Sequence, residues 1–502
     1  MRKLCFLMLF VPCCLLATAQ KTTTKTNTAN RFDAYVQHAV QLWKTPGLSV
    51  VVVKDSQVVF NKGYGVRELG KQDAFNTATI SICASTTKAM TAVCMGMLVD
   101  EGKIKWTDKV SDVYPELKLS DNYANSELTI KDLFTHNAGL GNADMLWVYN
   151  YNIDTIIQRM RYLQPAYSFR SSFMYQNLMY MVAGEVIHKV SGKPWDQFIT
   201  ERLFQPLGMT NTYASYKRSA ASNNRITPHF MYEDSIVKPI SYSDREAVGA
   251  AGGVWSCADD MSKWMLFMLD SAKINGNRLL QPETYSMLFK PQAIVTASEF
   301  YPTATLTKPH WTTYGLGWFQ EDYKGKMVQF HTGSLAGAVA ILGLIPDEHF
   351  GVYIFANMDH TEIRHALMYK AMDLWVFNDD ANDWSADFYK IYSTQGAAYK
   401  KEEQETEAKR VLNTNPSLSL KDYTGKYGNE VYGSASIVLQ GDSLVLQLPN
   451  NLNVDLSHWN YDTFLGKYEQ QWNGKDFLQF NLNTLGKVSS FSFSGMTYDK
   501  KE

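Results

Sequence analysis

The sequence has neither an excess of charge of one sign nor the residue clusters that bind metals, and both absences exclude classes of protein. Its 502 residues carry 48 lysines and arginines against 50 aspartates and glutamates, so the formal net charge is −2. A chain this balanced does not bind nucleic acid through bulk electrostatic attraction. No CxxC, HExxH or clustered His/Asp run has the spacing of metal ligands. We therefore expect no nucleic-acid partner, no metal and no other cofactor.

Cysteine is also scarce, with six residues in the whole chain. Three of them lie in the apolar N-terminal stretch, and an odd number remains: Cys83, Cys94 and Cys257. This count excludes a disulfide framework in an exported chain of this size. Hydrophobic residues, at 45%, are abundant enough to build a large core.

The N-terminus is typical of a secretory signal. Arg2 and Lys3 precede an apolar run at residues 4–17, and Ala17-Thr18-Ala19 has the small-x-small pattern of a cleavage site. We expect a signal peptide at 1–19, cleaved after Ala19, and a secreted or periplasmic product.

A lipoprotein is the alternative, because Cys13 and Cys14 lie in the same run, but neither follows a convincing small-residue lipobox. No later stretch is long and apolar enough to cross a membrane, so we expect no transmembrane segment after signal removal. Residues 20–31 are polar and low in complexity, which favours a flexible leader.

The hydrophobic pattern predicts an α+β domain at residues 32–376. The patterns are helical at 32–44, about 86–269 and 364–376, and strand-like at 48–53, 337–345 and 352–356. Helices between early and late strands indicate a mixed sheet whose edge strands come from both ends of the domain.

The chain changes character near residue 400, where a charged stretch lacks apolar periodicity. We interpret 377–415 as a linker or a solvated helix. Beyond it, short alternating strands separated by Gly and Asp turns predict a small all-β domain at 416–502, either a sandwich or a barrel.

Three short motifs carry the candidate chemistry, and the first is Ser85-Thr86-Thr87-Lys88 at the start of a predicted helix. Ser85 falls where unpaired N–H groups and the positive end of the helix dipole converge, and Lys88 lies one turn further on the same face. A serine hydroxyl needs a base to take its proton, and a buried lysine can serve as that base. A second match, Ser235-Ile236-Val237-Lys238, precedes a proline and has β-branched interior residues, so it should not start a helix.

The second motif is Tyr175-Gln176-Asn177, and the third is His331-Thr332-Gly333, followed by Ser334. A phenol near the serine can relay a proton to a leaving group, and a carboxamide can hold a substrate carbonyl or amide. Gly333 would let an edge strand approach a ligand closely. The backbone N–H groups of Ser334 and Ser85 could form an oxyanion hole, and His331 would add a donor whose charge changes with pH.

Further segments accompany these motifs: Pro46-Gly47-Leu48, Ala251-Gly252-Gly253 and Tyr314-Gly315-Leu316-Gly317-Trp318. Together they resemble the serine β-lactamase and penicillin-binding-protein superfamily, in particular its class C-like branch of esterases, D-peptidases and acyltransferases. The tail after residue 419 resembles a small β-barrel domain that is often appended to this branch. The resemblance implies a β-lactamase-like α+β fold, with a mixed antiparallel sheet flanked by helices and an all-helical lobe, followed by an all-β barrel.

The same resemblance implies roles for the motif residues. Ser85 would be the acylated nucleophile, Lys88 its base and Tyr175 a proton shuttle, and Asn177 and the His331-Thr332-Gly333 strand would line the site. His331 stands where β-lactamases of this type usually carry lysine. A mostly neutral imidazole anchors a substrate carboxylate poorly, which argues against penicillins as the main substrate.

We therefore expect an exported serine hydrolase that cleaves an ester or amide bond of a small-molecule acyl substrate through a covalent acyl-enzyme on Ser85. One alternative is an acyltransferase that moves the acyl group onto a lipophilic alcohol such as a sterol. Others are a D-Ala-D-Ala peptidase or β-lactamase, and an inactive binding protein that holds its ligand with the barrel. Aromatic residues would suit a lipophilic acceptor, although ordinary loop packing explains them equally well: Trp147, Tyr149, Tyr151, Phe300, Tyr301, Trp311 and Tyr314.

Overall fold

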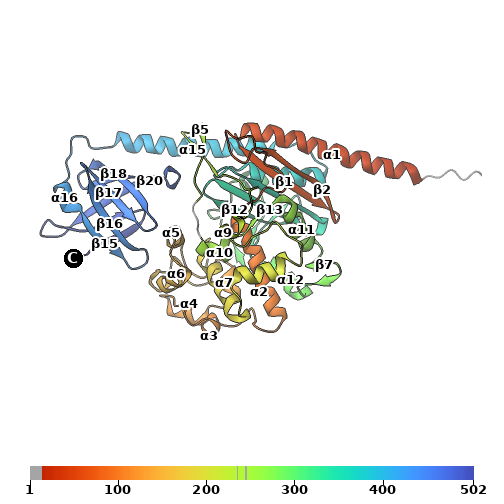
Figure 1. The fold of residues 1–502 in the computed structure, drawn as a ribbon, viewed down its shortest axis with the longest axis horizontal. Coiled ribbons are helices and arrows are strands. Elements are labelled where there is room, and N and C mark those ends of the chain that lie inside the picture. Colours follow the sequence, from red (N-terminus) through yellow and green to blue (C-terminus); the bar gives the residue numbers. More distant parts are fainter. Residues whose placement is uncertain (1–13, 234–235, 243–245, 502) are drawn as a thin grey trace, which may run out of the picture.

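The computed structural model describes residues 14–233, 236–242 and 246–501, and its larger domain is built on an eight-stranded sheet (Figure 1). The strands follow the spatial order β2-β1-β14-β13-β12-β11-β10-β9. Their bounds are β1 Gly47–Lys54, β2 Gln57–Gly65, β9 Ala293–Ile294, β10 Thr312–Tyr314, β11 Phe319–Tyr323, β12 Lys326–Leu335, β13 Ala338–Ile345 and β14 Phe350–Ala356.

The α+β class predicted from the sequence is confirmed, but the sheet is not mixed. Every neighbouring pair within it is antiparallel. Tight turns join the consecutive strands from β10 to β14, and strands joined by such turns pair antiparallel. The N-terminal hairpin joins the sheet through β1, which pairs with β14. The edges are therefore β2 and β9, and the second comes from the middle of the chain rather than from its end.

Helices cover both faces of the sheet, so that two cores form. Alternate valines of β1 belong to different cores. One core includes α2 (Thr87–Asp100) and α11 (Ala258–Leu269), and the other includes α1 (Cys14–Leu42) and α14 (Ile363–Met372). Because successive side chains point to opposite faces of a strand, a strand buried on both faces requires the uninterrupted valine run seen in β1.

A helical lobe surrounds α2. Every residue from 87 to 98 of this helix is buried, so protein encloses it on all sides. Its neighbours include α7 (Leu178–Ser191), α8 (Trp195–Ile199) and α10 (Gly249–Gly252). The other short elements of this domain are α3 Val110–Val113, α4 Asn122–Glu127, α5 Met145–Val148, α6 Ile153–Arg159, α9 Tyr216–Ser219, α12 Pro282–Phe289, α13 Ala304–Thr307, β3 Ser81–Ile82, β4 His229–Tyr232, β5 Ile236–Pro239, β6 Trp255–Ser256, β7 Lys273–Ile274 and β8 Asn277–Arg278.

The N-terminal segment differs from its prediction. The sequence predicts a flexible leader at 20–31, but these residues continue the helix α1. Neither proline nor glycine occurs between Pro12 and Pro46, so nothing in the sequence interrupts the helix before its end. The first part of the predicted signal peptide, residues 1–13, lies outside the described residues.

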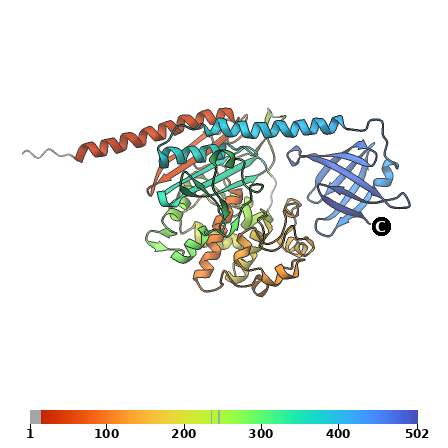
Figure 2. The same ribbon diagram turned by 180° about the vertical axis from the view of Figure 1, so that it is seen from behind.

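A long helix, α15 (Trp384–Ala408), leads from the sheet domain to a closed barrel. Two views show it running along one side of the sheet domain toward the barrel (Figure 1, Figure 2). After α16 (Leu420–Tyr423), the barrel strands are β15 Gly425–Asn429, β16 Gly433–Gln440, β17 Ser443–Leu448, β18 Leu452–Asn460, β19 Thr463–Tyr468, β20 Lys475–Leu482, β21 Val488–Phe493 and β22 Met496–Lys500. The first and last strands pair and close the barrel, whose core includes aromatic side chains such as Tyr427, Phe480 and Phe491.

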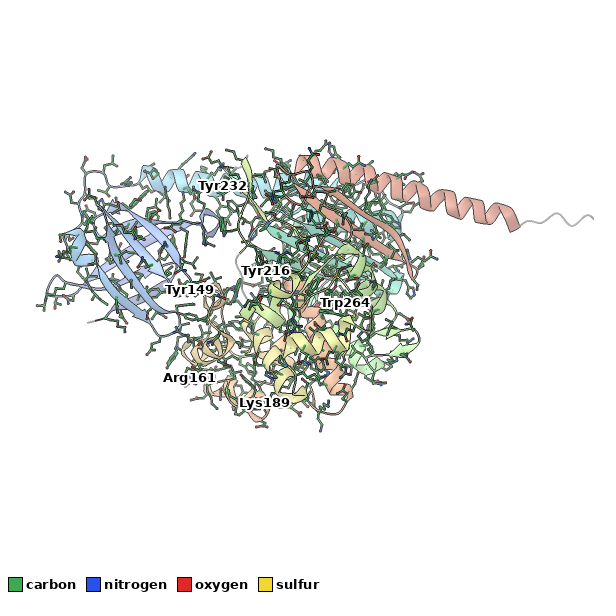
Figure 3. The ribbon with its side chains drawn as sticks, in the orientation of Figure 1. Tyr149, Arg161, Lys189, Tyr216, Tyr232 and Trp264 are labelled. Atoms are coloured by element: carbon green, nitrogen blue, oxygen red, sulfur yellow. The ribbon has the colours of Figure 1, made fainter. Side chains whose placement is uncertain are left out.

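The barrel docks on the helical lobe through the segment that contains α5 and α6. Tyr149 and Tyr498 share a hydrogen bond of 3.2 Å, and the Tyr151 hydroxyl donates to the Tyr432 carbonyl at 3.0 Å. Arg159 donates to a further barrel carbonyl at 2.9 Å. Figure 3 shows Tyr149 on the side of the lobe that faces the barrel. Within the described part of the chain, no helix combines the length and apolar character needed to cross a membrane.

Candidate active site

Ser85 lies in the 3-10 turn η1 (Ala84–Thr86), which runs directly into α2. The preceding residue, Ala84, has a φ of 46°, and this left-handed conformation costs a non-glycine residue about 1–3 kcal/mol. Gly333 of β12 lies against the same turn, where an added Cβ would come within 2.2 Å of the Cys83 carbonyl oxygen and 3.0 Å of Ser85 N. Gly333 therefore does approach a neighbouring group closely, as predicted. The group is the backbone turn that carries Ser85, and not a ligand.

Lys88 is fully buried one turn along from Ser85. Its Nζ donates to Ser85 Oγ at 3.1 Å, to Asn177 Oδ1 at 2.6 Å and to the Ala251 carbonyl at 2.8 Å. Burial lowers the pKa of Lys88 to about 7, although the negative charge of Asp144 acts in the opposite direction. When the amine is neutral, Asn177 and Ala251 hold its two hydrogens, and its lone pair is left to face the Ser85 hydroxyl.

Asn177 is oriented by a residue that the sequence motifs did not single out. Its Nδ2 donates to both carboxylate oxygens of Asp144, at 3.0 and 3.1 Å. Because a carboxylate only accepts, this contact turns the amide nitrogen toward Asp144 and the amide oxygen toward Lys88. Asp144 lies in a loop beside α5 and has no motif of its own, so only the folded chain brings it next to Asn177.

Tyr175 contributes a buried hydroxyl beside the serine and the lysine. Lys88 Nζ lies 5.0 Å from the centre of its ring. Burial raises the pKa of Tyr175 well above its usual value, and the neighbouring Ser85 hydroxyl offsets part of the rise. Among the described residues, no group meets the geometry of a full hydrogen bond to this hydroxyl. The phenol is therefore protonated at neutral pH and available to a substrate atom.

His331 is enclosed by the protein. Its Nδ1 donates to the Thr332 carbonyl at 2.6 Å, so its Nε2 accepts from the Tyr314 hydroxyl at 2.9 Å. The ring is 1% exposed, and burial lowers its pKa to about 3. Both ring nitrogens therefore bond to protein groups, and burial favours the neutral imidazole near pH 7. These contacts favour a positioning role for His331, and its catalytic role stays a prediction.

The neighbouring part of β12 forms a local strand edge at the site. β12 pairs with β11 only as far as Phe330, whereas its pairing with β13 continues to Leu335. Arg364 secures this edge, because its Nη1 donates to the Gly333 carbonyl at 2.6 Å and to Ser334 Oγ at 2.8 Å. Glu362 pairs with the guanidinium at 2.7 Å. Sequence reasoning did not identify this buried ion pair. The oxyanion hole expected from the N–H groups of Ser85 and Ser334 stays a prediction.

A cavity of about 590 Å³ opens at Ser85, and its lining includes Tyr175, Asn177, Thr332 and Ser334. This volume is in the usual range for small-molecule sites. A second cavity of about 520 Å³ lies among α7, α8 and α10, but its lining does not contain Ser85. The chemistry therefore belongs to the first cavity.

The aromatic residues that the sequence suggests for a lipophilic pocket separate into three groups. Trp147, Phe300 and Tyr301 line the cavity that contains Ser85. Tyr149 and Tyr151 contact the barrel instead. The third group is outside the cavity: Tyr314 is buried behind it against His331, and Trp311 is 42% exposed.

The second Ser-x-x-Lys match lies on a strand where the structure describes it. Ser235 lies outside the described residues, and Ile236–Pro239 form the strand β5. The prediction that this copy starts no helix is confirmed by that strand. The cysteines Cys83, Cys94 and Cys257 are buried and free, and burial raises the pKa of the Cys83 thiol to about 12. They are small core residues.

Comparisons with known proteins agree with the geometry. The family model described as Beta-lactamase matches residues 32–374, and a domain of unknown function, DUF3471, matches residues 409–502. The unguisins hydrolase ungD' of Aspergillus campestris is 27% identical over 425 residues, which cover 81% of this chain and 77% of that protein.

Two solved structures share the fold along nearly the whole chain. The octameric penicillin-binding protein homologue from Pyrococcus abyssi has a TM-score of 0.61 at 18% identity and covers 94% of this chain and 99% of its own. SurE has a TM-score of 0.57 at 16% identity and covers 96% of this chain and 100% of its own. The resemblance found in the sequence motifs, including the C-terminal barrel, is confirmed.

Proposed function

Because this chain belongs to the beta-lactamase family and is a hydrolase of that type, we propose that it cleaves ester or amide bonds through a covalent acyl-enzyme on Ser85. The observation that carries the proposal is the contact of 3.1 Å between Lys88 Nζ and Ser85 Oγ at the wall of a substrate-sized cavity. A nucleophile and a base within hydrogen-bond reach are the minimum for this chemistry.

In the acylation step, Ser85 Oγ attacks the carbonyl carbon of the substrate while its proton passes to the neutral amine of Lys88. The ammonium that forms has three hydrogens, and the same three oxygens are in place to accept them. The charge therefore develops in a site that needs little reorganisation, which is the usual source of electrostatic catalysis.

The N–H groups of Ser85 and Ser334 would stabilise the negative oxygen of the tetrahedral intermediate. The loss of one such donor typically costs about 2.7–4 kcal/mol of transition-state stabilisation. Tyr175 would then give its proton to the leaving oxygen or nitrogen, and the Lys88 ammonium would return a proton to Tyr175 and become neutral again. In the second half of the reaction, water attacks the acyl carbonyl, and the neutral amine of Lys88 takes one proton of that water. When the bond between the acyl carbon and Ser85 Oγ breaks, this proton passes from Lys88 to Ser85 Oγ, which regenerates the serine.

We also propose that the protein acts outside the cytoplasm as a secreted or periplasmic enzyme. The support is the sequence alone: two basic residues, an apolar run and the Ala17-Thr18-Ala19 site. N-terminal sequencing of the exported product should begin at Gln20. A product that begins with lipid-modified Cys13 or Cys14 would instead establish a lipoprotein.

Two other activities compete with simple hydrolysis. A D-Ala-D-Ala peptidase or β-lactamase must hold a substrate carboxylate, and the neutral, enclosed ring of His331 supplies no charge for it. An acyltransferase is favoured by one observation, the aromatic wall formed by Trp147, Phe300 and Tyr301, which suits an apolar alcohol. A relative named as a hydrolase supports water as the acceptor.

The test of the acyl-enzyme is labelling with a fluorophosphonate probe, followed by mapping of the modified peptide. Wild type and Ser235→Ala should be labelled on Ser85, and Ser85→Ala should not be labelled. Persistent labelling of Ser85→Ala would end the assignment. Product analysis with p-nitrophenyl esters and rising concentrations of an alcohol then separates the two outcomes, since free acid alone indicates a hydrolase and a new ester indicates a transferase.

A further inference from the structure

One wall of the cavity at Ser85 comes from the other domain. Trp472 and Asn473 line this cavity together with the serine. They belong to the short turn η8 (Gln471–Asn473), which connects strands β19 and β20 of the barrel. In Figure 1, the β20 side of the barrel faces the sheet domain. The site proposed for catalysis is therefore completed by residues that lie far away in the sequence.

The turn that carries Trp472 is well defined by its own hydrogen bonds. Asn473 donates from its backbone N to the Gln470 carbonyl at 2.8 Å and from Nδ2 to Gln470 Oε1 at 3.1 Å. Gly474 N donates to the Gln471 carbonyl at 3.0 Å and has a φ of 84°, which favours glycine. The turn is therefore a fixed projection of the barrel rather than a loose tail.

The position of this projection relative to Ser85 is set by the docking of the barrel. The contacts of Tyr149, Tyr151 and Arg159 hold the barrel on the segment next to α5. The same segment places Trp147 in the cavity and Asp144 against Asn177. One stretch of chain thus supports the catalytic amide, an aromatic wall of the cavity and the domain that brings Trp472.

We propose that Trp472 is a specificity-determining residue that binds an apolar group of the substrate remote from the scissile carbonyl. The proposal rests on the acyl-enzyme function proposed above and adds a substrate class, namely elongated esters or amides with a bulky apolar group. Trp472 is half-buried, and the cavity also contains Trp147 and Phe300. Aromatic walls of this kind bury large apolar area at low conformational cost.

A small substrate that reaches only Ser85 and Tyr175 does not need this wall. An elongated substrate fills more of the roughly 590 Å³ and reaches the turn of the barrel. Removal of the Trp472 ring should therefore discriminate between the two kinds of substrate, whereas damage to the catalytic groups affects both.

The experiment compares kcat/KM of wild type, Trp472→Ala and Trp472→Phe with three esters. p-Nitrophenyl acetate is the small substrate, p-nitrophenyl 4-phenylbutyrate is elongated on the acyl side, and 4-phenylbutyl acetate is elongated on the alcohol side. Trp472→Ala should lose about 10-fold or more with at least one elongated ester and change less than about 2-fold with the small one. Trp472→Phe should recover part of the loss.

The control is Trp311→Ala, which removes an exposed tryptophan outside the cavity and should leave all three values unchanged. Equal losses with all three esters, or no loss with any, would overturn the proposal while Ser85-dependent turnover of p-nitrophenyl acetate still supports the acyl-enzyme. If no ester is turned over through Ser85, the proposed function itself fails. Melting temperatures of the variants should match wild type, since Trp472 lies at a surface turn.

Discussion

At the scale of single residues, the central feature is a lysine whose surroundings favour the neutral amine. Lys88 is buried, and its two fixed acceptors are neutral oxygens of Asn177 and Ala251. Neutral acceptors bond to the hydrogens of the amine, but they do not offset the free-energy cost of burying the positive charge of an ammonium. The carboxylate of Asp144 bonds to Asn177 and offsets only part of the fall in the pKa of Lys88.

This arrangement predicts a pH profile. Acylation needs the neutral amine, so the rate of fluorophosphonate modification of Ser85 should rise with pH around a midpoint near 7, the pKa of Lys88. Asp144→Asn removes a charge that raises this pKa, so its midpoint should move to lower pH. His331→Gln should keep the midpoint of wild type, because that ring is neutral throughout the range. A midpoint that follows His331 and not Asp144 would contradict the assignment.

A second residue-scale prediction concerns Gly333. An alanine there would press against the Cys83 carbonyl and Ser85 N, so the backbone must move where the nucleophile is displayed. Gly333→Ala should lower the rate of acylation strongly and destabilise the fold by about 1–3 kcal/mol. The matched control is Gly396→Ala in the exposed helix α15, where a Cβ meets nothing within 4 Å. That change should stabilise the protein by about 0.5–1 kcal/mol.

The sequence predicts which closely spaced residues share one face of an element, but it does not predict which distant side chains they contact. The spacing of Ser85 and Lys88 predicts one helix face, because helix geometry alone determines it. The contacts of His331 could not be predicted, because the motif does not contain its partner: Tyr314 comes from β10 and bonds to one ring nitrogen. Asp144 and Arg364 were missed for the same reason, since each acts through a partner that only the fold supplies.

At the scale of elements, the buried acid Glu321 of β11 forms a hydrogen bond to α14. Glu321 is enclosed, accepts from the Tyr369 hydroxyl on one oxygen, and has no partner for the other among the described residues. Burial raises the pKa of Glu321 from 4.5 to about 7. The folded state thus holds a proton that the unfolded state releases between these values, so this residue's contribution to stability falls as pH rises through that window.

Glu321→Gln should remove this dependence. The difference in unfolding free energy between variant and wild type should shift in favour of the variant by up to about 1.4 kcal/mol per pH unit between pH 4.5 and 7. Thermal or urea unfolding at several pH values measures it. Parallel stability curves for the two proteins would show that Glu321 is ionised in the folded state.

Elements with strong periodicity were predicted well, and their pairing was not. The valine run of β1 predicts a strand buried on both faces. Nothing in that run specifies β14 as its partner, and this pairing makes the sheet antiparallel. The leader at 20–31 was misjudged because polar composition was weighed over the absence of helix breakers.

At the scale of the whole molecule, the barrel is part of the site. Two other polar or aromatic barrel residues do not line the cavity: His458 donates from Nε2 to the Tyr461 carbonyl, and Trp459 packs beside Arg410. The barrel instead contributes Trp472, in a turn with no motif. Which barrel turn faces Ser85 depends on docking, which local sequence patterns do not encode.

Variants that weaken the docking of the barrel on the helical lobe should therefore lose the same activity as Trp472→Ala. The double variant Tyr151→Phe/Arg159→Ala removes two hydrogen bonds to the barrel. It should reduce turnover of elongated esters about 10-fold while p-nitrophenyl acetate stays within about 2-fold of wild type. Lys189→Ala is the control, because this exposed lysine pairs with Glu116 of the lobe and lies away from the barrel (Figure 3). Unchanged turnover of every ester would mean that these contacts do not hold the barrel wall in place.

The charge state of the Lys88 amine is the most direct test of the proposed catalytic mechanism. Lysines labelled with 13C at Cε can be followed by NMR as pH rises, with Lys88→Met to assign the signal. We predict that a single lysine, absent from the variant, titrates with a midpoint near 7. A Lys88 signal that titrates near 10, as an ordinary lysine does, would contradict a neutral base beside Ser85.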